Sequence, residues 1–206
     1  MAGNCPGPPR RPAPGLPGCL RFPPSLSGAW WEYPVGPQGP GREESKVSKR
    51  IDVAALEAVV GSLYPAPFGQ PCTNRERRRL GDAAGLTQFG VNLMRLPPGS
   101  WSSQRHWHSH EDEFVYVLAG EVTLVTEAGT EILRAGDAAG FRAGDPDGHS
   151  LQNRSATDAL VLEVGSRAPA QDVTTYPDID LVAPAGRAPA IFTHRDGTPY
   201  PNVVRR

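Results

Sequence analysis

Residues 99–120 carry the strongest pattern in the chain: Gly-Ser-Trp-Ser-Ser-Gln-Arg-His-Trp-His-Ser-His-Glu-Asp-Glu-Phe-Val-Tyr-Val-Leu-Ala-Gly. Three of the five histidines, His106, His108 and His110, lie in this stretch, and Glu113 follows closely. Side chains on a strand alternate between the two faces of a sheet, so a His-x-His run points two imidazoles the same way. Two imidazoles and a carboxylate that converge on one point form a ligand set for a divalent metal such as zinc, iron, nickel or manganese.

A second segment, punctuated by glycine, follows at residues 136–153. It begins with Gly136-Asp137, passes through Pro146-Asp147-Gly148, and ends with His149 and Asn153. Taken in order, the two segments resemble the two motifs of the cupin superfamily. Those motifs have the forms G-x5-H-x-H-x(3,4)-E-x6-G and G-x5-P-x-G-x2-H-x3-N, with a variable stretch between them.

The match to these motifs is close, with three departures. Apart from Gly99, which lies one residue too far upstream, the first motif is matched by His106-x-His108-x4-Glu113-x6-Gly120. In the second motif, Arg142 stands where proline is usual, and two extra residues separate Gly144 from His149. The loss of the proline affects the local turn and no ligand. The resemblance covers roughly residues 85–165.

The cupin resemblance implies a ligand set and a cofactor. Carried over residue by residue, it gives as metal ligands His106, His108, Glu113 and His149. The expected cofactor is one divalent transition metal, and iron, manganese, nickel and zinc are all admissible. His110 has the parity of an inward residue, but it follows the ligand pair in a loop. We therefore expect it either at the rim of the pocket or simply in solvent.

The resemblance also implies a class of function. The run Arg-His-Trp-His-x-x-Glu-Asp-Glu-Phe-Val-Tyr-Val-Leu is similar to that of small single-domain bacterial cupins labelled sugar-phosphate isomerase-like. We expect a metal-dependent enzyme acting on a small oxygenated or anionic metabolite, of the isomerase, lyase or dioxygenase type. The alternative is a non-catalytic, metal-supported cupin that binds or senses a small molecule. The family also implies a homodimer.

The spacing of apolar residues predicts an all-β fold. Alternating patterns predict strands at 89–96, 113–119, 121–126, 130–134, 138–142, 149–153 and 159–164, separated by turns such as Ala135-Gly136-Asp137. Many short strands with frequent turn signals are typical of a sandwich or barrel. Residues 85–165 should form a cupin-type antiparallel jelly-roll β-barrel of six to eight strands, with irregular N- and C-terminal arms.

The rest of the chain divides around this barrel. Residues 1–45 are rich in proline and glycine without periodicity, which predicts a disordered tail. Residues 46–84 are expected to form an N-terminal arm, with Val47 as a hypothetical native start, and residues 166–206 a C-terminal arm. The arms should lie over the barrel or reach a second subunit. His194, alone in a polar turn, is expected at the surface.

Polar residues that could act on a substrate are harder to identify than the ligands. Arg95 or Arg105 would suit a substrate carboxylate or phosphate. Alternatively, Arg105 pairs with Asp112, and Glu163 faces solvent. Tyr116 is interpreted as a core residue. The candidates are Arg95 at an expected inward strand position, Gln104, Arg105, Asn153 and Glu163.

Composition narrows the classes further. The formal net charge is −1, so no global field favours nucleic acid or an anionic membrane. No apolar run approaches the roughly 20 residues needed to span a bilayer, and prolines interrupt any signal-peptide pattern at the N-terminus. The three cysteines, Cys5, Cys19 and Cys72, imply no disulfide framework. We therefore expect a cytoplasmic protein that binds neither nucleic acid nor membrane.

Overall fold

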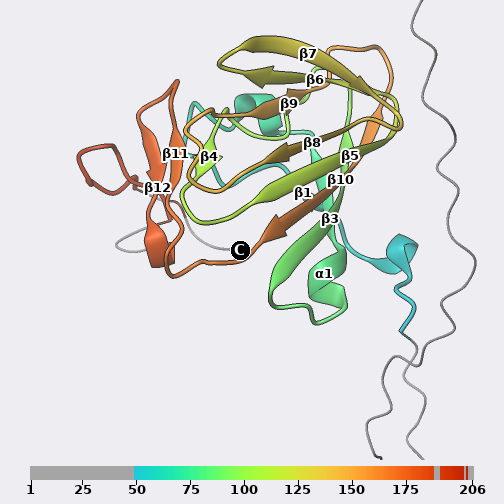
Figure 1. The fold of residues 1–206 in the computed structure, drawn as a ribbon, viewed down its shortest axis with the longest axis horizontal. Coiled ribbons are helices and arrows are strands. Elements are labelled where there is room, and N and C mark those ends of the chain that lie inside the picture. The colour runs from blue at the N-terminus through green and yellow to red at the C-terminus, as the bar shows by residue number, and fades with distance from the viewer. Residues whose placement is uncertain (1–48, 188–190, 202, 204–206) are drawn as a thin grey trace, which may run out of the picture. The chain divides into compact units, whose positions relative to one another are not determined.

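In the described part of the chain, twelve strands are arranged in three antiparallel sheets (Figure 1). The computed structural model describes residues 49–187, 191–201 and 203. The strands are β1 (Val59–Val60), β2 (Glu76–Arg79), β3 (Phe89–Leu96), β4 (Trp107–His108), β5 (Glu113–Ala119), β6 (Glu121–Thr126), β7 (Gly129–Arg134), β8 (Ala138–Phe141), β9 (Ser150–Gln152), β10 (Ala159–Ser166), β11 (Thr174–Tyr176) and β12 (Leu181–Ala183). The helices are α1 (Leu80–Ala83) and three 3₁₀ turns, Val53–Ala55, Gln70–Cys72 and Ala185–Arg187.

The largest sheet has the strand order β1-β2-β3-β10-β5-β8. Facing it is the sheet β7-β6-β9, in which β6 pairs with both neighbours in antiparallel register. These strands agree closely with the predicted ranges, and the antiparallel jelly-roll fold is confirmed. The apolar core lies between the two sheets, and its fully buried members are Met94, Leu96, Val117, Val122, Leu151, Ala159 and Val161.

Alternation along β5 assigns its side chains to two environments. Val115 and Val117 point into the core, with exposed fractions of 6% and 0%. Phe114, Tyr116 and Leu118 point outward and are 38–45% exposed. The interpretation of Tyr116 as a core residue is therefore wrong, because a run with no polar residue at alternate positions does not show which face is buried.

Gly120 marks the sharp turn from β5 to β6. Its φ of 73° lies in the left-handed region, and a Cβ built there would lie 2.5 Å from the carbonyl oxygen of Asp158. Both observations require glycine at this position. The last glycine of the first motif thus closes the strand that begins with Glu113.

Segments on both sides of the barrel sequence add strands to the fold. Within residues 46–84, β1 pairs with β2, and β2 pairs with β3 at the edge of the large sheet. After the barrel, β11 pairs with both β12 and β4, and a second apolar cluster forms around Tyr176, Leu181, Ala183 and Phe192. The tail predicted to be disordered, residues 1–45, lies outside the described residues.

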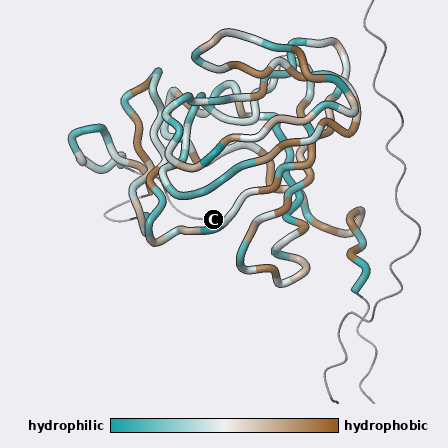
Figure 2. The backbone as a smooth tube through the Cα atoms, in the orientation of Figure 1, coloured by the Kyte–Doolittle hydropathy of each residue, from teal (hydrophilic) through white to brown (hydrophobic). Residues whose placement is uncertain are grey.

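Hydropathy follows this arrangement along the chain, with hydrophobic segments recurring on β3 and β10 and hydrophilic ones in many connections (Figure 2). In the described part of the chain, no helix has the length and apolar character needed to cross a membrane.

Candidate metal centre

Three short stretches of backbone bring the predicted ligands together. His108 lies on β4, and Glu113 is the first residue of β5. His106 and His149 are tied to each other by two backbone hydrogen bonds, from His106 N to His149 O at 3.1 Å and from His149 N to His106 O at 2.8 Å. The two motifs, about forty residues apart, therefore meet through a local β-bridge.

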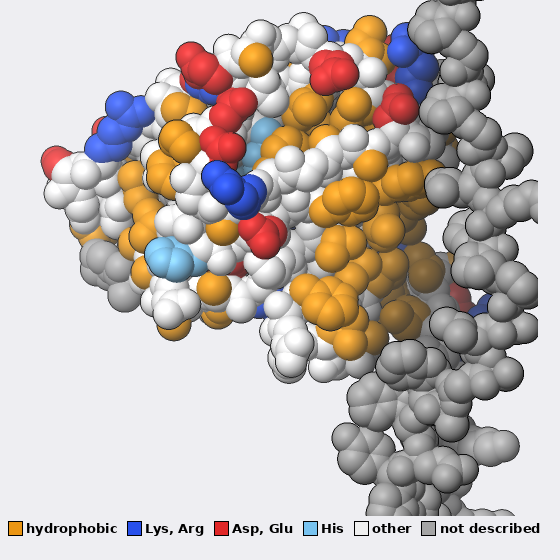
Figure 3. All heavy atoms as spheres, viewed as in Figure 1, with side chains coloured by type: hydrophobic (Ala, Val, Ile, Leu, Met, Phe, Trp, Pro, Cys, Tyr) orange, Lys and Arg blue, Asp and Glu red, His pale blue; other side chains and the backbone are white. Residues whose placement is uncertain are grey.

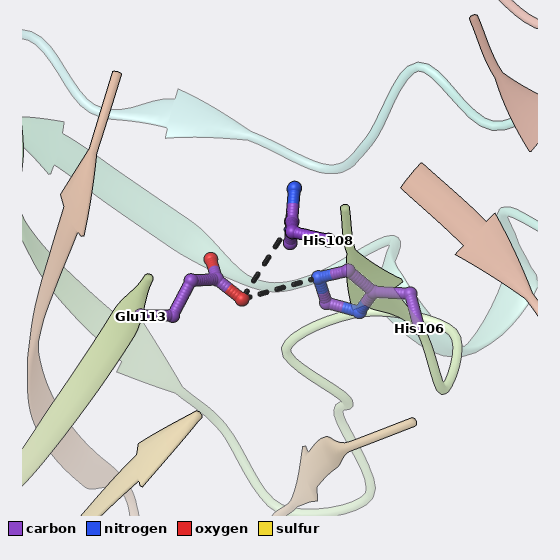
Figure 4. A group of neighbouring side chains, drawn as sticks. All are labelled: His106, His108 and Glu113. Carbon is purple, nitrogen blue, oxygen red and sulfur yellow. Dashed lines mark ion pairs between the residues drawn. The ribbon is translucent and has the colours of Figure 1, made fainter. Parts of the chain in front are cut away.

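The three imidazoles face a single carboxylate oxygen. Glu113 Oε2 lies 3.5 Å from His106 Nε2, 3.6 Å from His108 Nε2 and 2.9 Å from His149 Nε2. The first two contacts are drawn in Figure 4. Ligand atoms bound about 2.1 Å from one metal at octahedral or tetrahedral angles lie about 3.0–3.4 Å apart. The three observed distances lie close to this range, and His106, His108 and Glu113 form a group that could hold a metal ion.

The protonation states of these groups also suit a metal. The Nδ1–H of His106 donates to the carbonyl oxygen of Gln104 at 2.9 Å, which leaves the Nε2 lone pair directed toward Glu113. Glu113 Oε2 is buried, and no hydrogen bond of acceptable geometry reaches it within the described residues. A buried carboxylate oxygen surrounded by imidazole nitrogens needs a cation, so these residues fit a divalent metal.

Burial and charge act in opposite directions on the pKa values of two of the ligands. Burial raises the pKa of Glu113, but the facing rings of His106 and His149 outweigh it and hold that pKa well below its ordinary value. Burial lowers the pKa of His149, and the facing charge of Glu113 only partly offsets this. Phe141 stacks on the His149 ring with centroids 3.5 Å apart and planes 3° apart. An ionised carboxylate and a neutral imidazole are the forms that bind a metal.

His108 has a partner that the motif does not contain. Its Nδ1 lies 2.7 Å from Oδ2 of Asp172, a residue that is only 4% exposed. Burial lowers the pKa of His108, but Asp172 and the charge of Glu113 outweigh this and raise it. For Asp172, burial acts to raise the pKa. Its contacts with His108 and the amide of His110 outweigh burial and bring that pKa below the ordinary value.

A cavity of about 310 Å³ opens onto the ligands. Three of them, His108, Glu113 and His149, contribute to its wall. Arg142 is the cation of this wall, and among the described residues its side chain takes part in no ion pair. The rest of the wall comprises Trp107, Glu111, Leu124, Thr126, Ala139, Gly140, Phe141, Asp145 and Asp147.

Arg95 does not point into the barrel, and the expectation that it does is wrong. The buried neighbours Met94 and Leu96 occupy the inner face of β3, so Arg95 between them lies on the outer face. There it forms ion pairs with Glu76 and, at 2.7 Å, with Asp158. Along this strand, residues 89, 91, 93 and 95 alternate with residues 90, 92, 94 and 96. Both sets contain a leucine, so the sequence does not show which set faces inward.

Two candidates that precede the ligands are held away from the cavity wall. Arg105 pairs with Asp178 at 2.6 Å and with Glu127 at 2.9 Å, in place of the alternative partner Asp112. The Asp178 carboxylate and the Glu127 carboxylate raise the pKa of Arg105 further above its ordinary value. The side chain of Gln104 donates to the carbonyl oxygen of Phe68 at 2.7 Å, so only its backbone contacts a ligand.

Glu163 and Asn153 have different surroundings. Glu163 shares the inner parity of Val161 on β10 and is bound to Arg77, with Arg77 Nε 2.7 Å from Glu163 Oε2. It is half-buried rather than free in solvent. Asn153 donates from Nδ2 to the carbonyl oxygens of Leu96 and Thr157, both at 2.7 Å, and so holds a turn together.

The two remaining histidines lie away from the ligand atoms. His110 is exposed, and its Nδ1 lies 2.9 Å from Ser109 Oγ. His194 bonds through Nδ1 to Asp180 at 2.7 Å and stacks on Tyr200.

Sequence reasoning missed three residues near the candidate ligands: Asp172 and Tyr176 contact them, and the exposed Arg142 lines the cavity beside them. Asp172 and Tyr176, which stacks on His106 at 5.6 Å, lie in the expected C-terminal arm, where no motif spacing indicates them. Arg142 was visible as the residue in place of the motif proline, and that departure was the available signal.

Comparisons with known proteins identify the family of the barrel. The Cupin domain family model matches residues 92–165. A crystal structure of a sugar phosphate isomerase from a cupin superfamily, from Silicibacter pomeroyi, is 42% identical. The alignment covers 74% of this chain and 97% of that one, with a TM-score of 0.68. No match was found among curated proteins.

A second solved structure, a protein of Acidithiobacillus ferrooxidans provisionally named a sugar phosphate isomerase, is 36% identical. That alignment covers 53% of this chain and 69% of the other, with a TM-score of 0.50. This chain belongs to the cupin superfamily. The region that matches the family model, residues 92–165, lies in the barrel. The two solved structures described above carry the name of an isomerase of sugar phosphates.

Proposed function

We propose that this protein is a metal-dependent cupin enzyme of the isomerase type, acting on a small, oxygenated, anionic metabolite such as a sugar phosphate. The observation that carries the proposal is the convergence of three imidazole Nε2 atoms on Glu113 Oε2. The similarity to an isomerase of sugar phosphates favours isomerisation over lyase or dioxygenase chemistry. The proposed ligands are His106, His108, Glu113 and His149.

The bound cation would supply Lewis-acid polarisation of a substrate carbonyl or hydroxyl oxygen. Iron, manganese, nickel and zinc all suit three imidazoles and one carboxylate. The protein contributes a wall in which Leu124, Ala139 and Phe141 keep water from one side of the ligands. A drier surrounding strengthens the electrostatic interactions of the site.

Arg142 supports the choice of an anionic substrate. It lies in the same wall as three of the ligands, and its guanidinium has no carboxylate partner among the described residues. Besides Glu113, the acidic residues of the wall accept hydrogen bonds from backbone amides: Glu111 from Ala168 N at 2.7 Å, Asp147 from Glu127 N at 2.7 Å, and Asp145 from Asp147 N at 3.2 Å. We therefore assign to Arg142 the role that the sequence suggested for Arg95 or Arg105.

The first test is metal analysis of the purified protein. We expect about one transition metal per chain, and expect His108→Ala to lose it, because both a donor and its geometry disappear. The matched control is His194→Ala, which removes an imidazole that is hydrogen-bonded to Asp180 and not to a proposed ligand. Full metal occupancy in His108→Ala would contradict the ligand assignment.

The second test is turnover. The metal-loaded protein should interconvert the aldose and ketose forms of a sugar phosphate in a panel followed by NMR. Loss of a charge-assisted contact worth about 1.5–3 kcal/mol predicts that Arg142→Ala raises KM about 10- to 100-fold. Arg95→Ala is the control and should leave KM unchanged. Tight binding of the panel without turnover would favour the alternative, a cupin that binds or senses its ligand.

We also propose that the protein forms a homodimer through the outer face of its large sheet. Exposed apolar side chains gather over β5, β10 and β3 (Figure 3). Phe89, Phe114, Tyr116 and Leu118 each expose 38–45% of their surface there. A contiguous apolar surface of this kind marks a protein–protein contact. Light scattering should give a dimer for the wild type and a monomer for Tyr116→Asp, whereas a wild-type monomer would contradict the proposal.

A further inference from the structure

We infer that Asp172, which lies after the barrel, is a positioning residue of the metal centre: it fixes which nitrogen of His108 faces the metal. The inference rests on the proposed metal centre and concerns a residue outside the matched cupin region, 92–165. Its support is a hydrogen-bond arrangement that permits only one tautomer of the neutral His108 ring.

The carboxylate of Asp172 faces four donors. Oδ2 lies 2.7 Å from His108 Nδ1 and 3.4 Å from Thr174 Oγ1, and Oδ1 lies 3.0 Å from the amide of His110. Oδ1 also accepts from Ser109 Oγ at 3.5 Å. An ionised carboxylate only accepts hydrogen bonds, so the proton of a neutral His108 ring must be on Nδ1. Nε2 then carries the lone pair, and Nε2 is the atom that faces Glu113.

The fold holds Asp172 in place through the strand that carries His108. β4 pairs with β11, with Thr174 opposite His108. Next to this pair, Ser109 N donates to Val173 O at 3.1 Å, and Val173 N donates to Ser109 Oγ at 2.7 Å. The residues that follow the barrel are therefore joined directly to the ligand strand, and Asp172 has little freedom to turn away.

A second cation site is the competing interpretation of this cluster. The potential donor atoms of His108, Glu111 and Asp172 all lie within 4.8 Å of one another. However, Glu111 Oε2 is 4.0 Å from His108 Nδ1, and Glu111 Oε1 is engaged with the amide of Ala168 at 2.7 Å. Donor hydrogens from Nδ1 and from a backbone amide already point at Asp172, and they would repel a cation there. The cluster is a hydrogen-bonded support for a single metal.

The expected loss of metal affinity follows from other carboxylates that are hydrogen-bonded to metal-bound histidines. A carboxylate that accepts from a metal-bound histidine fixes the ring and raises its basicity, and removing it weakens metal affinity about 10- to 100-fold. The chain offers a matched control, because His194 and Asp180 form a pair with the same 2.7 Å distance from Nδ1 to Oδ2. Asp180 is exposed and His194 is partly exposed, and no hydrogen bond or ion pair joins either of them to a proposed ligand among the described residues.

The experiment measures zinc affinity by competition with a chromogenic chelator in full-length wild type, Asp172→Ala and Asp180→Ala. We expect one zinc per chain, an affinity 10- to 100-fold lower in Asp172→Ala, and wild-type affinity in Asp180→Ala. Unchanged affinity in Asp172→Ala would overturn the inference while leaving the metal centre intact. Two zinc ions per chain in the wild type would also overturn it, in favour of the second site.

A second measurement needs no variant and covers the case in which Asp172→Ala fails to fold. Long-range proton–nitrogen correlation spectra of the ¹⁵N-labelled wild type report which ring nitrogen carries the proton. His108 should be protonated on Nδ1 in both the metal-free and the zinc-loaded protein. A ring that carries its proton on Nε2 and not on Nδ1 would refute the inference. A wild type that binds no zinc would contradict the metal centre, and the metal-free spectrum would still decide the role of Asp172.

Discussion

The two faces of β5 are built from one uninterrupted sequence, yet they serve different purposes. On the inner face, Glu113 directs Oε2 toward His149 Nε2, and Val117 is fully buried. On the outer face, Phe114 and Tyr116 are substantially exposed. The comparison teaches that once the face of Glu113 is known, the alternation of side chains assigns every later residue of β5 to a face.

The same division extends to neighbouring strands. Glu163 on β10 and Arg77 on β2 form an ion pair on the inner side of the large sheet. Arg95 on β3 and Glu76 on β2 form one on the outer side. Each pair joins one arginine to one glutamate. Removing the glutamate from each pair therefore tests whether an ion pair contributes more to the free energy of unfolding on the inner side than on the outer side.

The largest expected effect comes from placing a charge on each face of β5. Val117→Asp would bury a carboxylate without a partner, and we expect it to cost at least about 4 kcal/mol in the free energy of unfolding. Tyr116→Asp, one residue away, should cost less than about 1 kcal/mol within a single chain. Urea denaturation of the metal-free variants at several protein concentrations measures both. Equal losses would show that β5 is not divided as described.

The two ion pairs give the next effect. Glu163→Gln leaves the inner Arg77 guanidinium without its charged partner, and we expect a loss of about 1.5–3 kcal/mol. Glu76→Gln, the matched change on the outer side, leaves Arg95 paired with Asp158 and exposed to solvent, and should cost less than about 1 kcal/mol. Denaturant midpoints compare the two. A larger loss for Glu76→Gln would reverse the assignment of inner and outer faces.

A smaller effect on the inner face is a pH dependence of the metal-free protein. The pKa of His108 is raised, so its contribution to stability is full below about pH 6.5 and is lost as the pH rises through the folded-state pKa. The pKa values of His149 and Glu113 are lowered, so their contributions are lost as the pH falls. Together these groups should stabilise the folded state most near about pH 6.5. Each unit of difference between the folded and unfolded pKa values of a group changes the free energy of unfolding by about 1.4 kcal/mol.

Urea midpoints between pH 5 and pH 8.5 in the presence of a chelator test this dependence. In His108→Gln the loss on the alkaline side should disappear, because the raised pKa of His108 is removed, while the loss on the acid side remains. An alkaline loss of equal size in that variant would assign it to another group.

The sequence was sufficient to predict the strands and the convergence of the four candidate side chains. Glycine-punctuated alternation specifies strands locally, and four ligands at motif spacing are separated only by short strands and turns. The turn at Gly120 and the place of Glu113 beside the His-x-His run could therefore be predicted from adjacent residues, whereas His149 was predicted from the resemblance to the second cupin motif.

What the sequence did not show depends on contacts between distant segments. Asp172 reaches His108 across 64 residues through strand pairing that no local pattern encodes. The orientation of Arg95 depended on choosing between two alternating sets that both contain apolar residues, and local hydrophobicity does not make that choice. Arg142 belongs to the cavity wall only because β8 turns beside His149.

The smallest expected effect is that of Arg95→Ala on the outer face. Its guanidinium binds Glu76 and Asp158, but all three side chains are partly exposed, and such pairs contribute about 0–1 kcal/mol. We expect a loss in that range by urea denaturation and no change in metal affinity or in KM for a turned-over substrate. Arg142→Ala should show the opposite pattern, with KM altered and stability unchanged. A change in KM for Arg95→Ala would mean that the outer face of the sheet communicates with the site, which its parity and its two carboxylate partners argue against.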